Sequence, residues 1–207
     1  MKQGFTLLEA MLAMAIMAVL ATLALPSIQS GVEQLNTKSA TQEVMHLIDF
    51  ARTQATTRRR AYELVVTQAA GDQAVISINE SSNALCSGLG QPGQTLNIRT
   101  LNLGNTDTGS LEEFENIRII ALRPADFSNL PRLCFHPSGR VLLSNGINSA
   151  VLPGTLTGAG AGEAGIVLRK FGRDRVSGSF SAIGPAHTIL IPYNGLARFQ
   201  PGDPLAP

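Results

Sequence analysis

The order of apolar and polar positions divides the chain into three parts. Residues 5–25 read FTLLEAMLAMAIMAVLATLAL, an almost unbroken apolar run in which Glu9 is the only charged residue. As an α-helix this run would rise about 32 Å, enough to cross a hydrocarbon core of about 30 Å. The pattern therefore predicts a membrane-spanning helix over 5–26, behind a short basic leader over 1–4.

After Pro26 the apolar positions recur at helical spacing, which predicts an amphipathic continuation of the helix over 27–60. Pro26 removes one helix hydrogen bond, so we expect it to bend the axis. Arg58, Arg59 and Arg60 end the pattern, where cations complement the negative end of the helix dipole. The apolar stripe is Ile28, Val32, Leu35, Val44, Leu47, Ile48, Ala51 and Ala55.

The third part shows strand-like runs separated by turns. Predicted strands cover 62–67, 73–79, 95–103, 116–122, 133–135, 140–143, 166–171 and 187–191. Segments 81–94 and 152–165, which are rich in Gly, Ser or Pro, are predicted as loops. A sheet with one apolar face would pack against the helical stripe, so the predicted fold is α+β: a long N-terminal helix on a mainly antiparallel β-sheet head over 61–207.

Length and charge limit the alternatives. A chain of 207 residues fits one domain plus an anchor, and its formal net charge of +1 gives no overall field that favours nucleic acid or an anionic surface. Lys2 favours keeping the leader in the cytoplasm, so the rest of the chain is exported. Cys86 and Cys134 both lie beyond the apolar run, and an even pair in an exported domain is more often one disulfide than two free thiols.

Glu9 is the anomaly of the apolar run, because a carboxylate in lipid costs a few kcal/mol unless it is paired or neutralised. Snorkelling to the membrane surface is one alternative, although the side chain is short. A secretory signal cleaved after the apolar run is another, although the run is long for such a signal and contains a charge. A positive partner for Glu9 explains the pattern better.

The segment Gly4-Phe5-Thr6-Leu7-Leu8-Glu9, between a basic leader and an apolar helix, resembles the class III signal of type IV pilins and pseudopilins. The resemblance implies that prepilin peptidase cleaves between Gly4 and Phe5, that Phe5 is N-methylated, and that Glu9 meets a neighbouring subunit's amino terminus. Such a pair offsets most of the cost of burying each charge and fixes axial register. Pro26 resembles the family's helix-kinking proline.

The long helix followed by strands resembles the GspH/FimT family, as do His136-Pro137-Ser138-Gly139-Arg140-Val141 and Asn194-Gly195-Leu196-Ala197-Arg198. The resemblance implies a minor pilin in type IV pilus assembly or priming, or alternatively a GspH-like pseudopilin of type II secretion. Implied partners are other pilins through the N-terminal helix, prepilin peptidase and the inner membrane. The implied location is single-pass in the bacterial inner membrane, with the C-terminal domain in the periplasm and incorporated into a pilus or pseudopilus.

Residues 169–175, RKFGRDR, form the strongest local charge cluster. Cations there can neutralise phosphates, and Phe171 can stack on an exposed base, so DNA is a candidate partner. The G-R-x-R spacing at 172–175 resembles a motif of DNA-binding FimT pilins. The alternative is that alternate residues simply form one solvent face of a strand hairpin. The candidate DNA-binding residues are Arg169, Lys170, Arg173 and Arg175.

Other chemistry finds little support in the sequence. His46, His136 and His187 are scattered, with no acidic partner at ligand spacing, so we expect no metal site. The G-x-G-x-x-G at 160–165 precedes a strand instead of opening a helix, and the acidic stretch 105–113 fails the EF-hand spacing. No G-x-S-x-G turn is present. We therefore expect no cofactor and no catalytic residue.

Overall fold

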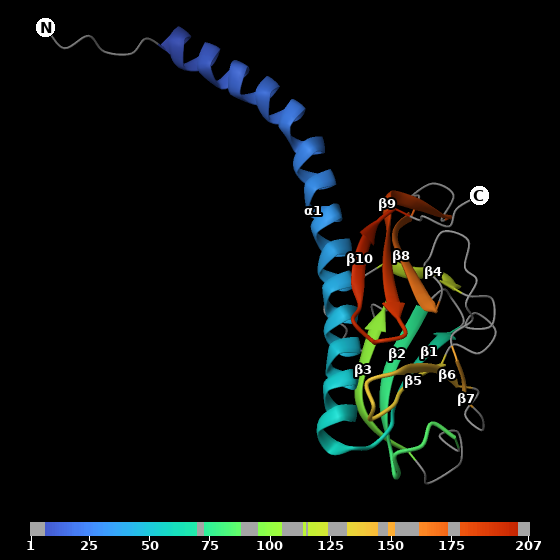
Figure 1. Cartoon of the computed structure of the whole chain (residues 1–207). Helices are drawn as coiled ribbons and strands as arrows, with labels where there is room; N and C mark the ends of the chain where they lie inside the picture. Colours follow the sequence, from blue (N-terminus) through green and yellow to red (C-terminus); the bar gives the residue numbers. More distant parts are fainter. Residues whose placement is uncertain are drawn as a thin grey trace, which may run out of the picture.

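The computed structural model describes residues 7–69, 73–87, 95–104, 114, 116–123, 132–144, 149–151, 162–173 and 179–202. Within these ranges it describes only the backbone of 23–30, 32, 33, 68, 69, 73, 123, 149–151 and 173. The described part comprises one long helix and ten strands. The helix runs along one side of a β-rich head, and its N-terminal half extends away from the head (Figure 1).

Helix α1 spans Leu7–Arg58, 52 residues without a break. It ends where Arg59 takes a left-handed backbone conformation, with φ of 54°. The guanidinium groups of Arg58 and Arg60 then pair with Glu80, at 3.2 and 3.3 Å. The arginine run therefore ties the helix end to the sheet, in addition to the dipole role that the sequence indicates.

The C-terminal half of α1 buries one face against the head, at helical spacing. It contacts strands of both sheets described below. Leu35, which the sequence pattern included in the apolar stripe, is instead 63% exposed, and the first buried helix residue is Thr37, about half a turn later. The buried helix residues are Thr37, Ala40, Thr41, Val44, Leu47, Ile48, Ala51 and Ala55.

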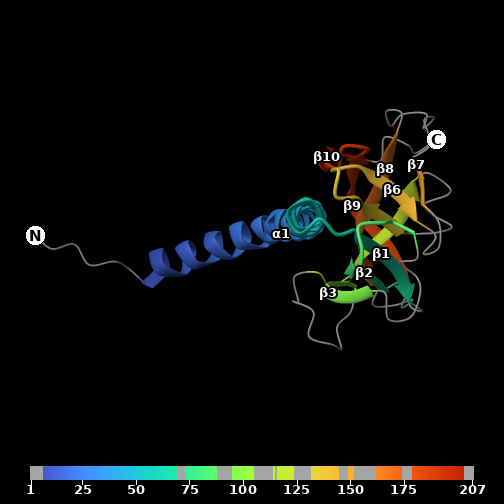
Figure 2. The ribbon, with the colours of Figure 1, turned by 60° about the horizontal axis from the view of Figure 1, so that its bottom comes forward.

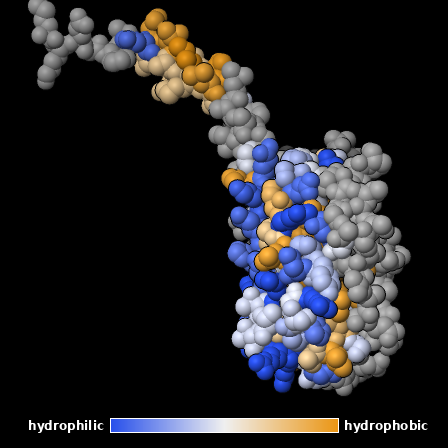
Figure 3. All heavy atoms as spheres, in the orientation of Figure 1, coloured by the Kyte–Doolittle hydropathy of each residue, from blue (hydrophilic) through white to orange (hydrophobic). Residues whose placement is uncertain are grey.

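The free half of α1 is apolar and exposed. Every residue from 7 to 22 is exposed, and Figure 3 shows their apolar side chains as a continuous surface that stands apart from the more polar head. Seen from a second direction, this half again points away from the head (Figure 2). Among the described residues, no helical stretch meets the combined length and hydropathy of a membrane span. The predicted span of 5–26 begins and ends outside the residues whose side chains are described.

The described strands form two antiparallel sheets. A six-stranded sheet has the order β3-β2-β1-β5-β6-β7, and a four-stranded sheet has the order β10-β9-β8-β4. The strands are β1 Tyr62–Ala69, β2 Gln73–Ser81, β3 Thr95–Leu103, β4 Ile117–Arg123, β5 Arg132–Phe135, β6 Val141–Ser144, β7 Ser149–Val151, β8 Glu163–Arg173, β9 Phe180–Pro192 and β10 Arg198–Pro201.

One apolar core joins the helix to both sheets. It combines the buried face of α1 with residues such as Leu64 and Ile76 of the larger sheet and Ile166 and Ile189 of the smaller one. The turn after β9 fastens this arrangement, because Arg52 of α1 donates from Nε to the Asn194 carbonyl at 3.0 Å. The α+β fold class predicted from the sequence is therefore confirmed.

Besides Leu35, several details of the prediction are wrong. Residues 163–165, predicted as the end of a loop, are the first residues of β8, and they pair with β9. The strands also divide between two sheets, whereas the sequence pattern indicated a single one. Strands β7 and β10 were not predicted, because β7 has only three residues, and β10 is mostly exposed and ends in a proline, so neither carries a recognisable apolar alternation.

Candidate functional sites

The N-terminal segment carries the processing and assembly residues expected from the sequence. Gly4 and Phe5 lie outside the described residues, so their roles remain predictions. Glu9 lies on the first described turn of α1 and is exposed, near the beginning of an exposed apolar surface that includes Leu8 and Leu12. This surface is available to lipid or to the helices of other subunits.

Pro26 lies in the stretch of α1 that connects the free and docked halves. The backbone is helical through this stretch, and the side chain of Pro26 is outside the described set. Figure 1 shows that the helix axis bends between the two halves. Gly31 lies in the same stretch, where a Cβ would meet nothing within 4 Å.

The predicted cationic cluster falls on the β8–β9 hairpin. Arg169 donates from Nε to the Gly184 carbonyl across the hairpin, at 3.1 Å, and Lys170 is partly buried. Arg173 is the last residue of β8, where only its backbone is described, and Arg175 lies outside the described residues. Arg169 and Lys170 are successive residues of one strand, so their side chains leave opposite faces of the sheet, and the other two positions stay predictions.

A further cation, Arg118 of β4, belongs to the same surface. Arg118 lies directly opposite Arg169 in the β4–β8 pairing. Its guanidinium stands 4.9 Å from the ring centre of Phe171 and 4.0 Å from that of Phe180, both within the range of a cation–π contact. The face of Phe171 next to Arg118 is therefore not free for a nucleic-acid base. Sequence reasoning missed Arg118 because only strand pairing brings it to the hairpin.

Cys86 and Cys134 form a disulfide that fastens the segment after β2 to β5. Their Cα atoms lie 5.8 Å apart, and both side chains are buried with Ala61 and Leu142 in a small cluster separate from the main core. Neither is available as a metal ligand or a nucleophile. The pairing confirms the disulfide that the sequence favoured.

Glu63, a buried carboxylate on β1, lies opposite Cys134. Its Oε2 accepts from Arg132 at 3.3 Å, while Oε1 has no hydrogen-bond partner among the described residues. Burial raises the pKa of Glu63, and the nearby Arg132 opposes that rise. The group stabilises the folded state best when it is protonated.

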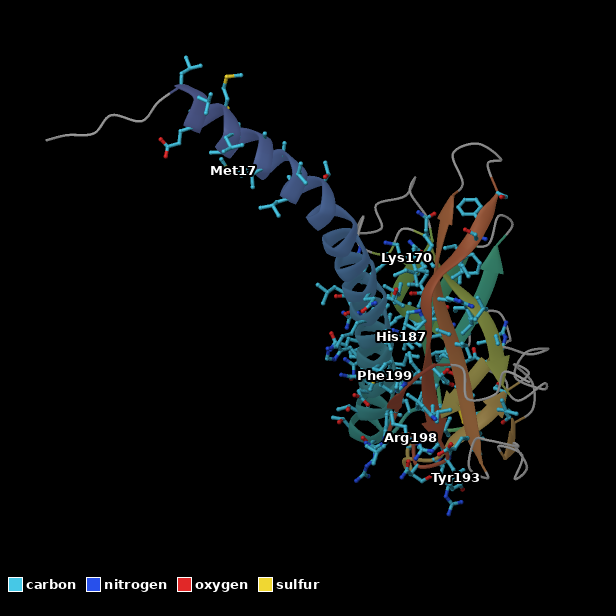
Figure 4. The ribbon with its side chains drawn as sticks, turned by 90° about the horizontal axis from the view of Figure 1, so that it is seen from above. Met17, Lys170, His187, Tyr193, Arg198 and Phe199 are labelled. Carbon is cyan, nitrogen blue, oxygen red and sulfur yellow. A yellow bond between two sulfur atoms is a disulfide. The ribbon has the colours of Figure 1, made fainter. Side chains whose placement is uncertain are left out.

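His187, on β9, is buried where α1, β9 and β10 meet. Its Nδ1 lies 3.3 Å from the Thr41 hydroxyl, which itself donates to the Thr37 carbonyl at 2.7 Å. The Phe199 ring packs edge to face against the imidazole, with ring centres 5.2 Å apart, and Figure 4 shows the two residues close together beside the docked helix. Burial lowers the pKa of His187.

Acidic, histidine and cysteine side chains do not gather into a metal-holding group of three or more anywhere in the described ranges. His46 is on α1, His136 follows β5 and His187 is on β9, so three different elements carry them. The expected absence of a metal site stays a prediction for the whole chain.

Comparisons with known proteins point to the amino terminus. Residues 1–25 match a family model described as the prokaryotic N-terminal methylation motif. The crystal structure of the type IV minor pilin FimU from Pseudomonas aeruginosa is similar at 16% sequence identity, over 83% of this chain and 92% of that one, with a TM-score of 0.44. No curated protein matches the chain significantly. The chain thus carries, over its leader and first helical turns, the N-terminal methylation motif.

Proposed function

We propose that this chain is a minor pilin: a membrane-anchored structural subunit, not an enzyme, that takes part in the assembly or priming of a type IV pilus. The match of residues 1–25 to the N-terminal methylation motif carries the proposal. The exposed apolar half of α1 agrees with it, because such a surface needs lipid or neighbouring helices to cover it.

The proposed path starts in the inner membrane, with the head in the periplasm. Prepilin peptidase cleaves between Gly4 and Phe5, and the new amino terminus of Phe5 is methylated. Glu9 then pairs with the amino terminus of an adjacent subunit. Two charges that are each unfavourable in an apolar environment become tolerable together, and their pairing sets the axial position of one subunit against the next.

Mass spectrometry of the mature amino terminus tests the processing step. We expect an N-methylated Phe5, and an intact Met1 would contradict the proposal. The assembly step is tested by Glu9→Ala, which should abolish recovery of the subunit in sheared filaments while the chain remains in the membrane fraction. Glu43→Ala is the matched control. Glu43 lies on the docked half of α1, where it pairs with Arg99 of β3, so its substitution should not affect incorporation.

A pseudopilin of type II secretion would use the same N-terminal chemistry. The two systems differ in the genes that neighbour this one and in the subunits that copurify with the chain. Copurification with secretion pseudopilins, and not with pilus subunits, would favour the secretion system.

DNA binding for uptake is a second candidate function, favoured by the addition of Arg118 to the cationic hairpin. Because the Phe171 ring already contacts Arg118, we expect contacts to phosphates and not stacking on bases. The full chain in detergent should shift duplex DNA, with affinity that falls steeply as salt rises. Arg173→Ala with Arg175→Ala should abolish the shift, and Arg59→Ala with Arg60→Ala should not. Equal binding by both double variants would remove this candidate.

A further inference from the structure

The cationic hairpin lies at one particular end of the head. We call the side chains of Arg118, Arg169, Phe171 and Phe180 the hairpin surface; Lys170 lies between Arg169 and Phe171 on β8, opposite the buried Ile117, and its side chain leaves the other face of the sheet. Figure 4 places Lys170 toward the end of the head where the free half of α1 leaves, and Tyr193 toward the opposite end. The predicted membrane segment ends near residue 25, and the docked helix begins near Thr37, about 18 Å farther along the axis. The hairpin surface therefore lies at the end of the head that faces the expected membrane.

The chemistry of the hairpin surface fits the boundary between water and lipid. It contains two cations, Arg118 and Arg169, and no acidic residue occurs in β4, in β8 after Leu168 or in β9 before His187. Phe180 is 43% exposed beside Arg118, and Ile120 of β4 is 39% exposed. Aromatic and basic side chains are enriched at membrane surfaces, where anionic headgroups attract cations within about one Debye length.

We propose that the hairpin surface contacts anionic phospholipid headgroups of the membrane in which α1 is anchored. This inference rests on the proposed membrane anchor. Tethering through α1 holds the head within reach of the bilayer, so even a weak electrostatic contact is populated at the high local concentration of headgroups. Its place on the side of the departing helix favours lipid over DNA, because DNA would approach a membrane-held head more readily from its far end.

This contact would set the orientation of the head before assembly. The helix bends between its free and docked halves (Figure 1), in a stretch where Pro26 lacks a hydrogen-bond donor and Gly31 lacks a Cβ, so the head can take different tilts relative to the membrane. A contact between the hairpin surface and headgroups selects the tilt that turns this end of the head toward the bilayer. Assembly then has to replace lipid contacts of both the apolar helix and the hairpin surface.

A single tryptophan provides the test, because the chain contains none. Phe180→Trp places the reporter on the hairpin surface, where tryptophan keeps the cation–π contact with Arg118. Phe199→Trp is the matched control, since Phe199 is also 43% exposed but lies on β10, away from the hairpin. Both variants of the full chain are reconstituted in nanodiscs of phosphatidylcholine alone or with phosphatidylglycerol, and quenching by lipids brominated near the headgroup is measured.

We expect quenching of the residue-180 reporter in phosphatidylglycerol nanodiscs, weaker quenching in phosphatidylcholine alone, and little change at residue 199 in either lipid. Adding Arg118→Gln and Arg169→Gln should reduce the anionic-lipid effect by about half or more. Arg140→Gln should not, because Arg140 stacks on Tyr193 at the other end of the head.

Two results would overturn the inference without contradicting the proposed membrane anchor. One is unquenched fluorescence of the residue-180 reporter in chain that copurifies with the nanodiscs. The other is quenching of equal strength in nanodiscs with and without phosphatidylglycerol. A fluorescence change on adding duplex DNA, without lipid quenching, would assign the surface to DNA instead. Failure of the full chain to enter either nanodisc would contradict the proposed membrane anchor, and therefore also the lipid contact that depends on it.

Discussion

At the residue scale, Glu63 shows how a buried charge makes stability depend on pH. Burial raises the folded-state pKa above that of the unfolded chain, so the folded state binds the proton more tightly. Stability from this group is therefore fully present below the unfolded pKa and is lost as pH rises through the folded pKa. The ion pair with Arg132 recovers part of that loss, since it gives the carboxylate a counter-charge at 3.3 Å.

Glu63→Gln should flatten this dependence. The amide keeps the shape and polarity of the protonated acid but cannot ionise, so we expect the variant to gain on the order of 1 kcal/mol relative to wild type as pH rises to neutrality. Chemical unfolding at a series of pH values measures the difference. Glu43→Gln is the control, because its partner Arg99 and its own side chain are both partly exposed. A pH-independent difference would show that lost packing dominates.

For His187 the dependence of stability on pH has the opposite sign. Its pKa is lowered by burial, so the unfolded chain binds the proton more readily than the folded chain does. Stability from His187 is present when the imidazole is neutral and falls as pH drops below the ordinary histidine range. Lys38, Arg169 and Arg198 on the neighbouring elements are cations, and a cation cannot stabilise the charged imidazole.

His187→Gln should therefore lose less stability than wild type between about pH 7.5 and about pH 5. Thermal unfolding of the full chain in detergent measures this loss, with His46→Gln as the control because His46 is exposed on α1. The variant starts from a lower stability, since the ring contact with Phe199 is gone. An acid-induced loss as large as that of wild type would exclude His187 as its source.

At the element scale, the sequence predicts what depends on local periodicity. The helical stripe over 44–55 and the alternation in β2 appear at the expected positions, because burial on one face imposes those periods, whereas residues 62–66 of β1 are buried on both faces. The division into two sheets depends on non-local pairing, which no local pattern encodes. The same limit explains why Lys170 was found as a candidate residue from its charged neighbours, whereas Arg118 was not.

The disulfide between Cys86 and Cys134 also acts at this scale, because it links two segments 48 residues apart. Closing a loop of that length is expected to stabilise the fold by about 2–4 kcal/mol, by restricting the unfolded chain. Cys86→Ala with Cys134→Ala should lower the unfolding free energy by this amount. Treating wild type with a dithiol should have a similar effect, and the double variant should not respond to it. A response of the double variant would show that the reductant acts elsewhere.

At the scale of the whole molecule, the two halves of α1 lie in different environments. The docked half of α1 completes the core of the head, while the free half presents apolar side chains without covering them. The orientation of the head relative to the free half of the helix is therefore only as fixed as the connecting stretch is rigid. That stretch contains Pro26 and Gly31, a residue that lacks a hydrogen-bond donor and one that lacks a Cβ.

The bend of α1 tests the predicted role of Pro26. In Figures 1 and 2 the free half points away from the head, so straightening the helix should bring residue 17 closer to the β8–β9 hairpin. Pro26→Ala restores a helix hydrogen bond, and a bend of about 20° acting over about 14 Å of helix moves residue 17 by up to about 5 Å. Spin labels at Met17→Cys and Ala182→Cys report this distance by pulsed electron resonance, since both native cysteines are held in the disulfide. Gly31→Ala in the labelled chain serves as the comparison, because it stiffens the same stretch but leaves the proline in place. An unchanged distance in the Pro26→Ala chain would show that contacts with the head, and not the proline, set the bend.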